Sequence, residues 1–230
     1  LMDERRSIPP YIILDFGNHG ILGLQSPSKY GGLELNNKDS MALMSQIGAI
    51  DLNLAIFVGL HNFLGIRPIQ QFGSTKLQDD LLPLLSTGRE LSAFGLTEPG
   101  AGSNAAAIQG TAKFNSNNSI ILNGTKMWIG NASWAGMINV FLRHVNKDGR
   151  QSGITAYIIR QDDKGLRMGP ELMTMGMRGM VQNLFYMEDL SVTSDRLLGD
   201  IGKGLNIAQD AMMHTRLALG AIFSGSMKRC

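Results

Sequence analysis

The sequence predicts an α+β multidomain protein: an N-terminal α-helical bundle, a middle β-barrel or β-sandwich domain, and the start of a C-terminal helical domain. Apolar residues recur at helical spacing in the first 90 residues and again after Gly204. Between them, short β-branched and aromatic segments alternate with turn signals. We therefore expect a helical domain at 1–90, a β domain at 91–200 and the first helix of a further helical domain at 201–230.

The composition narrows the class of protein. A chain of 230 residues with 43% hydrophobic and 17% charged residues is long and apolar enough to bury a sizeable core. The net charge of +2 comes with no Lys/Arg block, so we expect no nucleic-acid partner. One cysteine, Cys230, excludes a disulfide framework and suits a reducing compartment, either the cytoplasm or, in a eukaryote, the mitochondrial matrix. No apolar run reaches the roughly 18 residues of a membrane span.

Two helices are expected before residue 90. Asp39 can cap a helix whose apolar residues run at spacings of three and four to Val58, and this helix is nearly apolar all round after Leu52, as in the middle of a bundle. Thr75 and Gln78 have the spacing of a capping box and open a second helix, in which Pro83 marks a kink or break and Gly88 a stop. A plain helical bundle explains these residues, including His61, without any chemistry.

Short strands are expected after Leu91. They are Ala112 to Phe114, Ile120 to Leu122, Met137 to Leu142, Ile154 to Ile159 and Leu184 to Met187. The turn signals between them are Asn117-Asn118, Asn123-Gly124, Asp148-Gly149 and Lys164-Gly165. This spacing favours a barrel or sandwich over a parallel α/β sheet.

Two segments of the middle region could bind a ligand. Residues 96–104 form a loop of small residues whose backbone N–H groups and hydroxyls could hold an anion, although a tight turn explains the glycines equally well. Residues 123–131 contain Trp128, which is either core filler or a flat wall for an aromatic ligand; the composition favours core filler.

Three segments taken together, Leu96 to Asn104, Leu122 to Ile129 and Gly176 to Gly179, closely resemble the acyl-CoA dehydrogenase family in order and spacing. The resemblance covers nearly the whole chain. It implies FAD held between the middle β domain and a C-terminal four-helix domain, of which residues 201–230 would be the beginning. It also implies dehydrogenation of an acyl thioester and a homo-oligomer, a tetramer or dimer.

The resemblance also implies site residues. The positions matching the family's flavin contacts are Phe94, Leu96, Thr97, Gly102, Ser103, Trp128, Ile129 and Gly130. The positions matching its acyl-CoA contacts are Ser103, Thr215 and Arg216. Two departures stand out: Gly130 replaces a Thr or Ser whose hydroxyl bonds the reactive flavin nitrogen, and Asn104 replaces an Asp.

The family removes the α-proton with a glutamate base. Isovaleryl-CoA and long-chain members supply that base from the residue before the Arg of this last helix, which is Thr215 here and cannot act as a carboxylate. Both ends of the chain resemble cuts in a longer protein, so we expect the base beyond Cys230, no catalytic residue within these 230 residues, and no turnover by this chain alone.

The remaining titratable residues favour structural roles. Glu98 precedes a proline in a loop, where a structural or solvent-paired carboxylate is expected rather than a base, and Arg178 is expected to pack or form a salt bridge. His61, His144 and His214 lie too far apart in sequence to suggest a metal site.

Three functions stay open. The first is an FAD-dependent dehydrogenase acting on an acyl-CoA or acyl-carrier thioester, with electron-transfer flavoprotein or oxygen as acceptor. The second is an enzyme of the same fold that uses flavin and oxygen as an oxidase or monooxygenase, which Gly130 makes conceivable. The third is a non-catalytic assembly or scaffold homologue.

Overall fold

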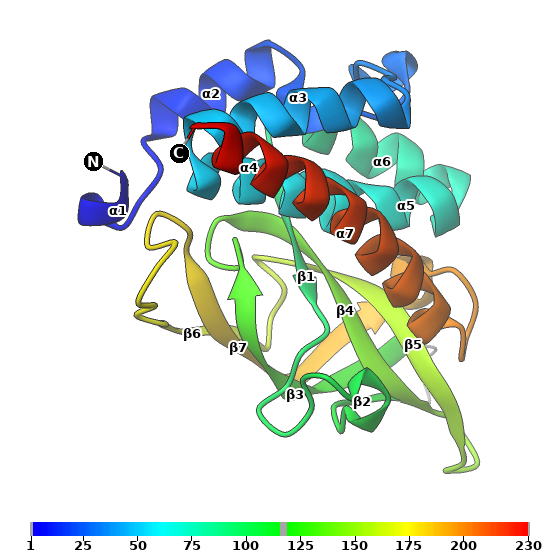
Figure 1. The fold of residues 1–230 in the computed structure, drawn as a ribbon. Helices are drawn as coiled ribbons and strands as arrows, with labels where there is room; N and C mark the ends of the chain where they lie inside the picture. Colours follow the sequence, from blue (N-terminus) through cyan, green and yellow to red (C-terminus); the bar gives the residue numbers. More distant parts are fainter. Residues whose placement is uncertain (1, 116–118, 230) are drawn as a thin grey trace.

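A layer of helices packs on a β-sheet in this computed structural model, which describes residues 2–115 and 119–229 (Figure 1). The helices that precede the sheet are α1 (Met2–Arg5), α2 (Pro10–Asn18), α3 (Asn37–Ile50), α4 (Leu52–Gly59), the π-helix η3 (Leu60–Ile66), α5 (Arg67–Phe72) and α6 (Thr75–Ser86). The strands are β1 (Leu91–Gly95), β2 (Thr111–Phe114), β3 (Ser119–Gly130), β4 (Ala135–Val145), β5 (Gln151–Arg160), β6 (Leu166–Glu171), β7 (Gln182–Thr193) and β8 (Leu197–Leu198), and α7 (Gly204–Arg229) follows. The predicted fold class, a helical region followed by a β region and a last helix, is confirmed.

The first long helix differs from its prediction. Asn36, not Asp39, caps α3, because its side-chain oxygen accepts from the backbone N–H of Asp39 at 2.9 Å. Asp51 then has an extended backbone and caps α4 by accepting from the N–H of Leu54 at 3.1 Å. The continuous helix expected up to Val58 was therefore wrong, since a capping carboxylate divides the apolar run into two helices.

Helix α6 also begins one residue earlier than predicted. The hydroxyl of Ser74 accepts from the N–H of Leu77 at 3.2 Å, so Ser74 and not Thr75 is the N-cap. Pro83 lies inside the helix and does not end it, because the neighbouring Leu82 and Leu85 are fully buried and packing holds the segment despite the lost N–H. The expected stop at Gly88 is confirmed by its left-handed φ of +70°.

The sheet has eight strands in the order β6-β7-β3-β2-β4-β5-β8, with β1 pairing off this path to β4. Strands β1 and β2 run parallel to β4, and all other pairs are antiparallel. The turn predicted at Asn123-Gly124 was wrong: β3 continues through these residues along β7, and the ladder shifts register between Leu122 and Gly124. The glycines of the other two turns have left-handed φ values of +80° at Gly149 and +97° at Gly165, while the Asn117-Asn118 turn lies outside the described residues.

The helices and the sheet share a buried core. One cluster of buried side chains joins the helices α5 to α7 to the sheet, and it includes Ile69, Leu82, Phe141, Ile158 and Ala208. Helix α7 also lies along α3, as Figure 1 shows. The two helices approach closely because Gly48 and Gly225 face the opposite backbones, where a Cβ atom would come within 2.4 Å of the Ile222 carbonyl oxygen and 1.8 Å of the Ser45 carbonyl oxygen.

Among the described residues, one helical stretch, Leu52–Phe72, is long and apolar enough to cross a membrane by length and composition. Of its most apolar window, 72% is buried inside the protein, as expected for a core helix. The stretch is longer than its apolar run suggests because α4, η3 and α5 follow one another without a break.

Candidate functional site

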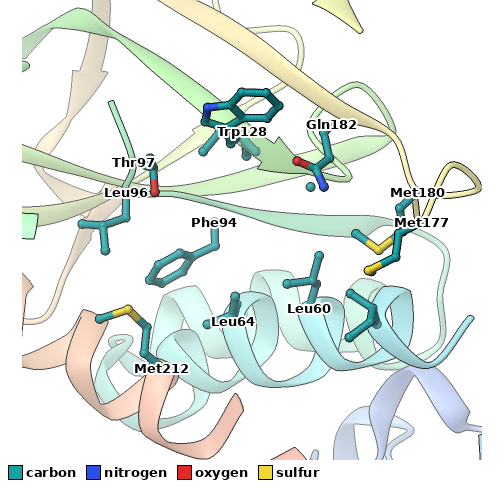
Figure 2. A pocket seen from close by; sticks show the side chains of 13 residues that line it. Leu60, Leu64, Phe94, Leu96, Thr97, Trp128, Met177, Met180, Gln182 and Met212 are labelled. Atoms are coloured by element: carbon teal, nitrogen blue, oxygen red, sulfur yellow. The ribbon is translucent and has the colours of Figure 1, made fainter. Parts of the chain in front are cut away.

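A cleft of about 310 Å³ lies between the helical layer and the sheet. One side, which we call the helical wall, consists of Ile56, Leu60 and Leu64. The opposite side, the sheet wall, consists of Phe94, Leu96, Thr97, Trp128, Ile129 and Gly130. Met177, Met180 and Gln182 complete the cleft from the β6–β7 connection and the start of β7, and Met212 completes it from α7 (Figure 2).

The sheet wall forms where two sequence segments meet. Strand β1 ends at Gly95, and beyond it the carbonyl oxygen of Thr97 accepts from the N–H of Met127 at 3.0 Å. The ladder between β3 and β7 shifts register between Lys126 and Ile129, and Trp128 has a left-handed φ of +61°. Trp128 is consequently 52% exposed at the cleft, while Ile129 is buried. The preference for Trp128 as core filler was wrong, because the shifted ladder turns its side chain out of the core.

A buried ion pair lies behind the sheet wall. The Lys126 ammonium donates to Glu98 Oε1 at 2.8 Å and to the carbonyl oxygens of Leu96 at 3.2 Å and Phe141 at 2.6 Å. Glu98 also accepts from the N–H groups of Gln109 and Gly110. Burial lowers the pKa of Lys126 to about 8, although its pairing with Glu98 opposes this change. Glu98 is thus a structural carboxylate that ties the loop after β1 to the sheet, and it is not free to act as a base.

The glycine-rich loop after Glu98 is open to solvent. A Cβ atom at Gly100 or Gly102 would meet nothing within 4 Å, so the backbone there is accessible to a ligand. Ser103 and Arg216 line a second cavity of about 340 Å³, and Met212 borders both cavities. Two of the three positions matched to acyl-CoA contacts, Ser103 and Arg216, therefore lie on the same cavity.

Two of the predicted site residues line neither cavity. Gly102 lies in the exposed loop beside Ser103. The hydroxyl of Thr215 donates to the carbonyl oxygen of Ala211 at 2.9 Å within α7. The roles that the resemblance implies stay predictions for all the predicted site residues, Gly102 and Thr215 included.

A side chain at Gly130 would require the aliphatic ends of neighbouring side chains to shift. A Cβ atom there would lie 2.6 Å from Leu60 Cδ1 and 3.2 Å from Met180 Cε. The edge of the cleft at Gly130 is consequently covered by aliphatic groups, and the side chains among the lining residues that carry an N–H or O–H group are Thr97, Trp128 and Gln182.

The remaining titratable residues singled out in the sequence have structural contacts in the described part of the chain. The Arg178 guanidinium nitrogen Nη1 lies 3.9 Å from Asp3 Oδ2, which confirms the expected salt bridge. The backbone N–H of Arg178 also donates to the Asp3 carboxylate at 3.0 Å. His61 is fully buried, donates from Nε2 to the Leu85 carbonyl oxygen at 2.9 Å, and has its pKa lowered to about 4 by burial. No group of three or more His, Cys, Asp or Glu side chains in the described part of the chain is placed to hold a metal ion.

Sequence reasoning missed the helical wall. Ile56, Leu60 and Leu64 recur at intervals of four in a segment that is apolar all round, so no amphipathic stripe distinguishes the cleft face from the core face. Met180 and Gln182 were missed because they follow the Gly176 to Gly179 motif without belonging to it.

A helical layer and a sheet that enclose an apolar cleft with an exposed tryptophan define an α+β protein with a candidate ligand-binding cleft. The model of the acyl-CoA dehydrogenase N-terminal domain matches residues 1–89, and the model of the acyl-CoA dehydrogenase middle domain matches residues 93–190. The chain belongs to the acyl-CoA dehydrogenase family.

Individual relatives agree with this assignment. The chain is 31% identical over 219 residues to the very long-chain specific acyl-CoA dehydrogenase of mouse mitochondria, a match that covers 91% of this chain and 33% of the relative. An acyl-CoA dehydrogenase from Bacillus anthracis, solved in complex with FAD, is 35% identical with a TM-score of 0.89, over 95% of this chain and 37% of that one. A prolyl acyl carrier protein oxidase is 27% identical with a TM-score of 0.91, over 98% of this chain and 60% of that one. The chain therefore spans about a third of the length of the mouse relative.

Proposed function

We propose that this chain is the flavin-binding part of an FAD-dependent enzyme that introduces an α,β double bond into an acyl thioester, in the first instance an acyl-CoA. The observation that carries the proposal is the cleft, which brings two of the three family segments onto one wall, the sheet wall, opposite an aliphatic wall. The relative from Bacillus anthracis that shares this fold was solved with FAD.

The residues of the cleft fit a flat aromatic group. Trp128 is a large apolar side chain that is 52% exposed and held by a backbone of left-handed φ, an arrangement that folding alone does not favour. A flavin ring against Trp128 would cover that face, and the open backbone at Gly100 and Gly102 could accept the phosphates. We propose as FAD contacts Phe94, Leu96, Thr97, Gly102, Ser103, Trp128, Ile129 and Gly130.

When bound, FAD supplies the hydride acceptor for such a reaction. The chain's own residues bind and shield the reacting groups: aliphatic side chains on both walls exclude water, which strengthens electrostatic interactions in the cleft. Ser103 and Arg216 lie together in the adjoining cavity, and we propose that they, with Thr215, bind the thioester ligand.

We propose that the proton acceptor comes from outside these residues. No Asp or Glu is among the residues that line either cavity, and the nearby Glu98 is held in its buried ion pair with Lys126. The chain alone should then bind flavin without turning over an acyl-CoA.

The rest of the proposal follows the family. We propose electron-transfer flavoprotein or oxygen as the electron acceptor, a homo-oligomeric assembly, and the cytoplasm or the mitochondrial matrix as the compartment. The mouse relative is named as mitochondrial.

The decisive experiment is an anaerobic visible-absorption titration of the natural full-length product with acyl-CoAs from butyryl to palmitoyl. We expect the flavin absorption to bleach as the hydride is transferred. A bound flavin that stays oxidised with every acyl-CoA and with acyl carrier protein thioesters would overturn the dehydrogenase proposal.

An oxygen-using enzyme is the second candidate, and Gly130 favours it. The aliphatic groups of Leu60 and Met180 occupy the space where most of the family has a hydroxyl, so the flavin would lack that hydrogen bond. The similarity to a prolyl acyl carrier protein oxidase also supports the oxygen-using candidate. Stoichiometric hydrogen peroxide during aerobic turnover would favour this candidate, and its absence would exclude an oxidase.

A further inference from the structure

The helical wall depends on a π-helix. Ile56 lies in α4, whereas Leu60 and Leu64 lie in η3, where the N–H that follows the segment, that of Arg67, bonds to the carbonyl oxygen of Asn62 five residues earlier. A π-helix is rare and is frequently found at functional sites. Its effect on the cleft and the contacts that stabilise it therefore indicate what this segment does.

The consequence is alignment of the wall. An α-helix turns by about 100° per residue, so four residues overshoot a full turn by roughly 40°. A π-helix has roughly 4.4 residues per turn, so four residues fall short of a full turn by roughly 30°. The step from Ile56 to Leu60 follows the α-helix and the step from Leu60 to Leu64 follows the π-helix, so the two angular offsets nearly cancel. All three side chains consequently face the cleft.

The cause begins with Pro68. In a continuous α-helix the carbonyl of Leu64 would accept from the N–H of residue 68, but proline has none, and its ring clashes with the carbonyl four residues before it. The buried side chain of Asn139 on β4 replaces that donor, bonding to the carbonyl oxygens of Leu64 at 3.0 Å and Gly65 at 2.9 Å.

The approach of β4 and β1 to the helix is close. A Cβ atom at Gly65 would lie 1.7 Å from Ser92 Oγ, so only glycine permits this contact. Asn139 Oδ1 is buried and has no hydrogen-bond partner in the described part of the chain. An unpaired buried acceptor is costly, so the two hydrogen bonds donated by the Asn139 amide have to offset that cost.

We propose that Asn139 is a positioning residue: its amide holds the π-helical turn that aligns Leu60 and Leu64 with Ile56, and this aligned wall binds the acyl part of the thioester. The identity of the ligand rests on the proposed function. The stabilisation of the π-helix by Asn139 is independent of that function.

The test compares variants of the natural full-length product with bound FAD. Asn139→Leu keeps the approximate size and removes the donor. Thr155→Val is the matched control, because it removes a buried hydroxyl from neighbouring β5 that accepts from the Gly202 N–H and bonds to Tyr157, and neither partner belongs to η3. The readouts are amide hydrogen exchange over residues 60–72, the dissociation constants of acyl-CoAs from butyryl to palmitoyl, and the dissociation constant of free coenzyme A.

In Asn139→Leu we expect faster exchange over residues 60–72 and roughly tenfold weaker binding of the best acyl-CoA, with free coenzyme A binding unchanged, since only the acyl chain meets the helical wall. Thr155→Val should leave all three readouts unchanged. Adding Pro68→Ala to Asn139→Leu supplies a backbone donor, so exchange should slow again while acyl-CoA affinity stays low, because the turn is then α-helical and the wall is out of line.

Three results would overturn the proposal. Unchanged exchange in Asn139→Leu would show that the amide does not hold the helix. An equal loss of affinity for acyl-CoA and free coenzyme A would show a general structural effect. If the unaltered protein binds no acyl-CoA, the proposed function and the acyl role fail together, and hydrogen exchange still decides whether Asn139 holds η3.

Discussion

The two walls of the cleft are built in opposite ways. The sheet wall presents an exposed, left-handed Trp128 on a strand whose ladder is interrupted, and a buried ion pair stabilises it from behind. The helical wall presents ordinary aliphatic side chains, but the buried amide of Asn139 bonds to its backbone carbonyls and holds it out of the α-helical form, while His61 links the same helix to Leu85 and Ser92. In the proposed function, the sheet wall thus acts through side chains that folding does not need, and the helical wall acts through its backbone geometry.

The largest effect should come from breaking the buried ion pair behind the sheet wall. Lys126→Met leaves Glu98 buried without its partner, which typically costs about 3–5 kcal/mol of folding free energy. Denaturant unfolding of the full-length product should show a large fall in the midpoint. Lys76→Met is the control, because its pair with Asp195 is exposed and should contribute little. Equal midpoints for Lys126→Met and Lys76→Met would refute a structural role for the buried pair.

The helical wall should respond to acid through His61. Its pKa is lowered from 6.5 to about 4, so between these values the unfolded chain binds more protons than the folded one. The free energy of unfolding should therefore be highest above pH 6.5 and fall by about 3 kcal/mol as the pH decreases to about 4. Nδ1 accepts from the Ser92 N–H at 3.2 Å, and protonation would break this bond.

The slope against pH isolates this effect. His61→Gln should lose most of the decline between pH 6.5 and 4, measured by denaturant unfolding at a series of pH values, even if its stability at neutral pH is lower. His19→Gln, at an exposed position, should keep the decline. A His61→Gln slope identical to that of the unaltered protein would assign the acid sensitivity to other groups.

A smaller effect should appear where the two walls touch. Gly130→Thr forces a Cβ to within 2.6 Å of Leu60 Cδ1, an overpacking that typically costs about 1–3 kcal/mol. Adding Leu60→Ala should recover part of that loss, so a double-mutant cycle from denaturation midpoints should give a favourable coupling between the two substitutions. Strictly additive effects would mean that Leu60 moves aside without cost.

The sequence was informative where local chemistry determines structure. The family segments predicted the sheet wall, and the helix–sheet–helix order followed from changes in hydrophobic spacing. Asn123-Gly124 misled because its turn chemistry was overridden by pairing along β7. Ile56, Leu60 and Leu64 were not predicted as a site because their alignment depends on Asn139, a residue of β4 that is 75 positions away from Leu64. Long-range hydrogen bonds of this kind leave no periodic pattern in the chain.

The smallest effect on stability should come from Trp128, and it separates the two walls most clearly. Trp128→Gly removes a side chain that is 52% exposed and relieves a φ of +61°, so the free energy of unfolding should change by less than about 0.5 kcal/mol. FAD affinity, measured by flavin fluorescence during titration of the apoprotein, should nevertheless fall roughly tenfold, since stacking and burial of the ring are lost.

The second tryptophan provides the matched control. Trp134 packs edge-on against buried Phe57 with ring centroids 6.3 Å apart, and it is not among the residues that line the cleft. Trp134→Ala should therefore destabilise the fold and leave the FAD affinity of the folded fraction unchanged. If Trp128→Gly instead lowered stability and spared FAD binding, Trp128 would be a structural residue and the sheet wall would not be the flavin surface.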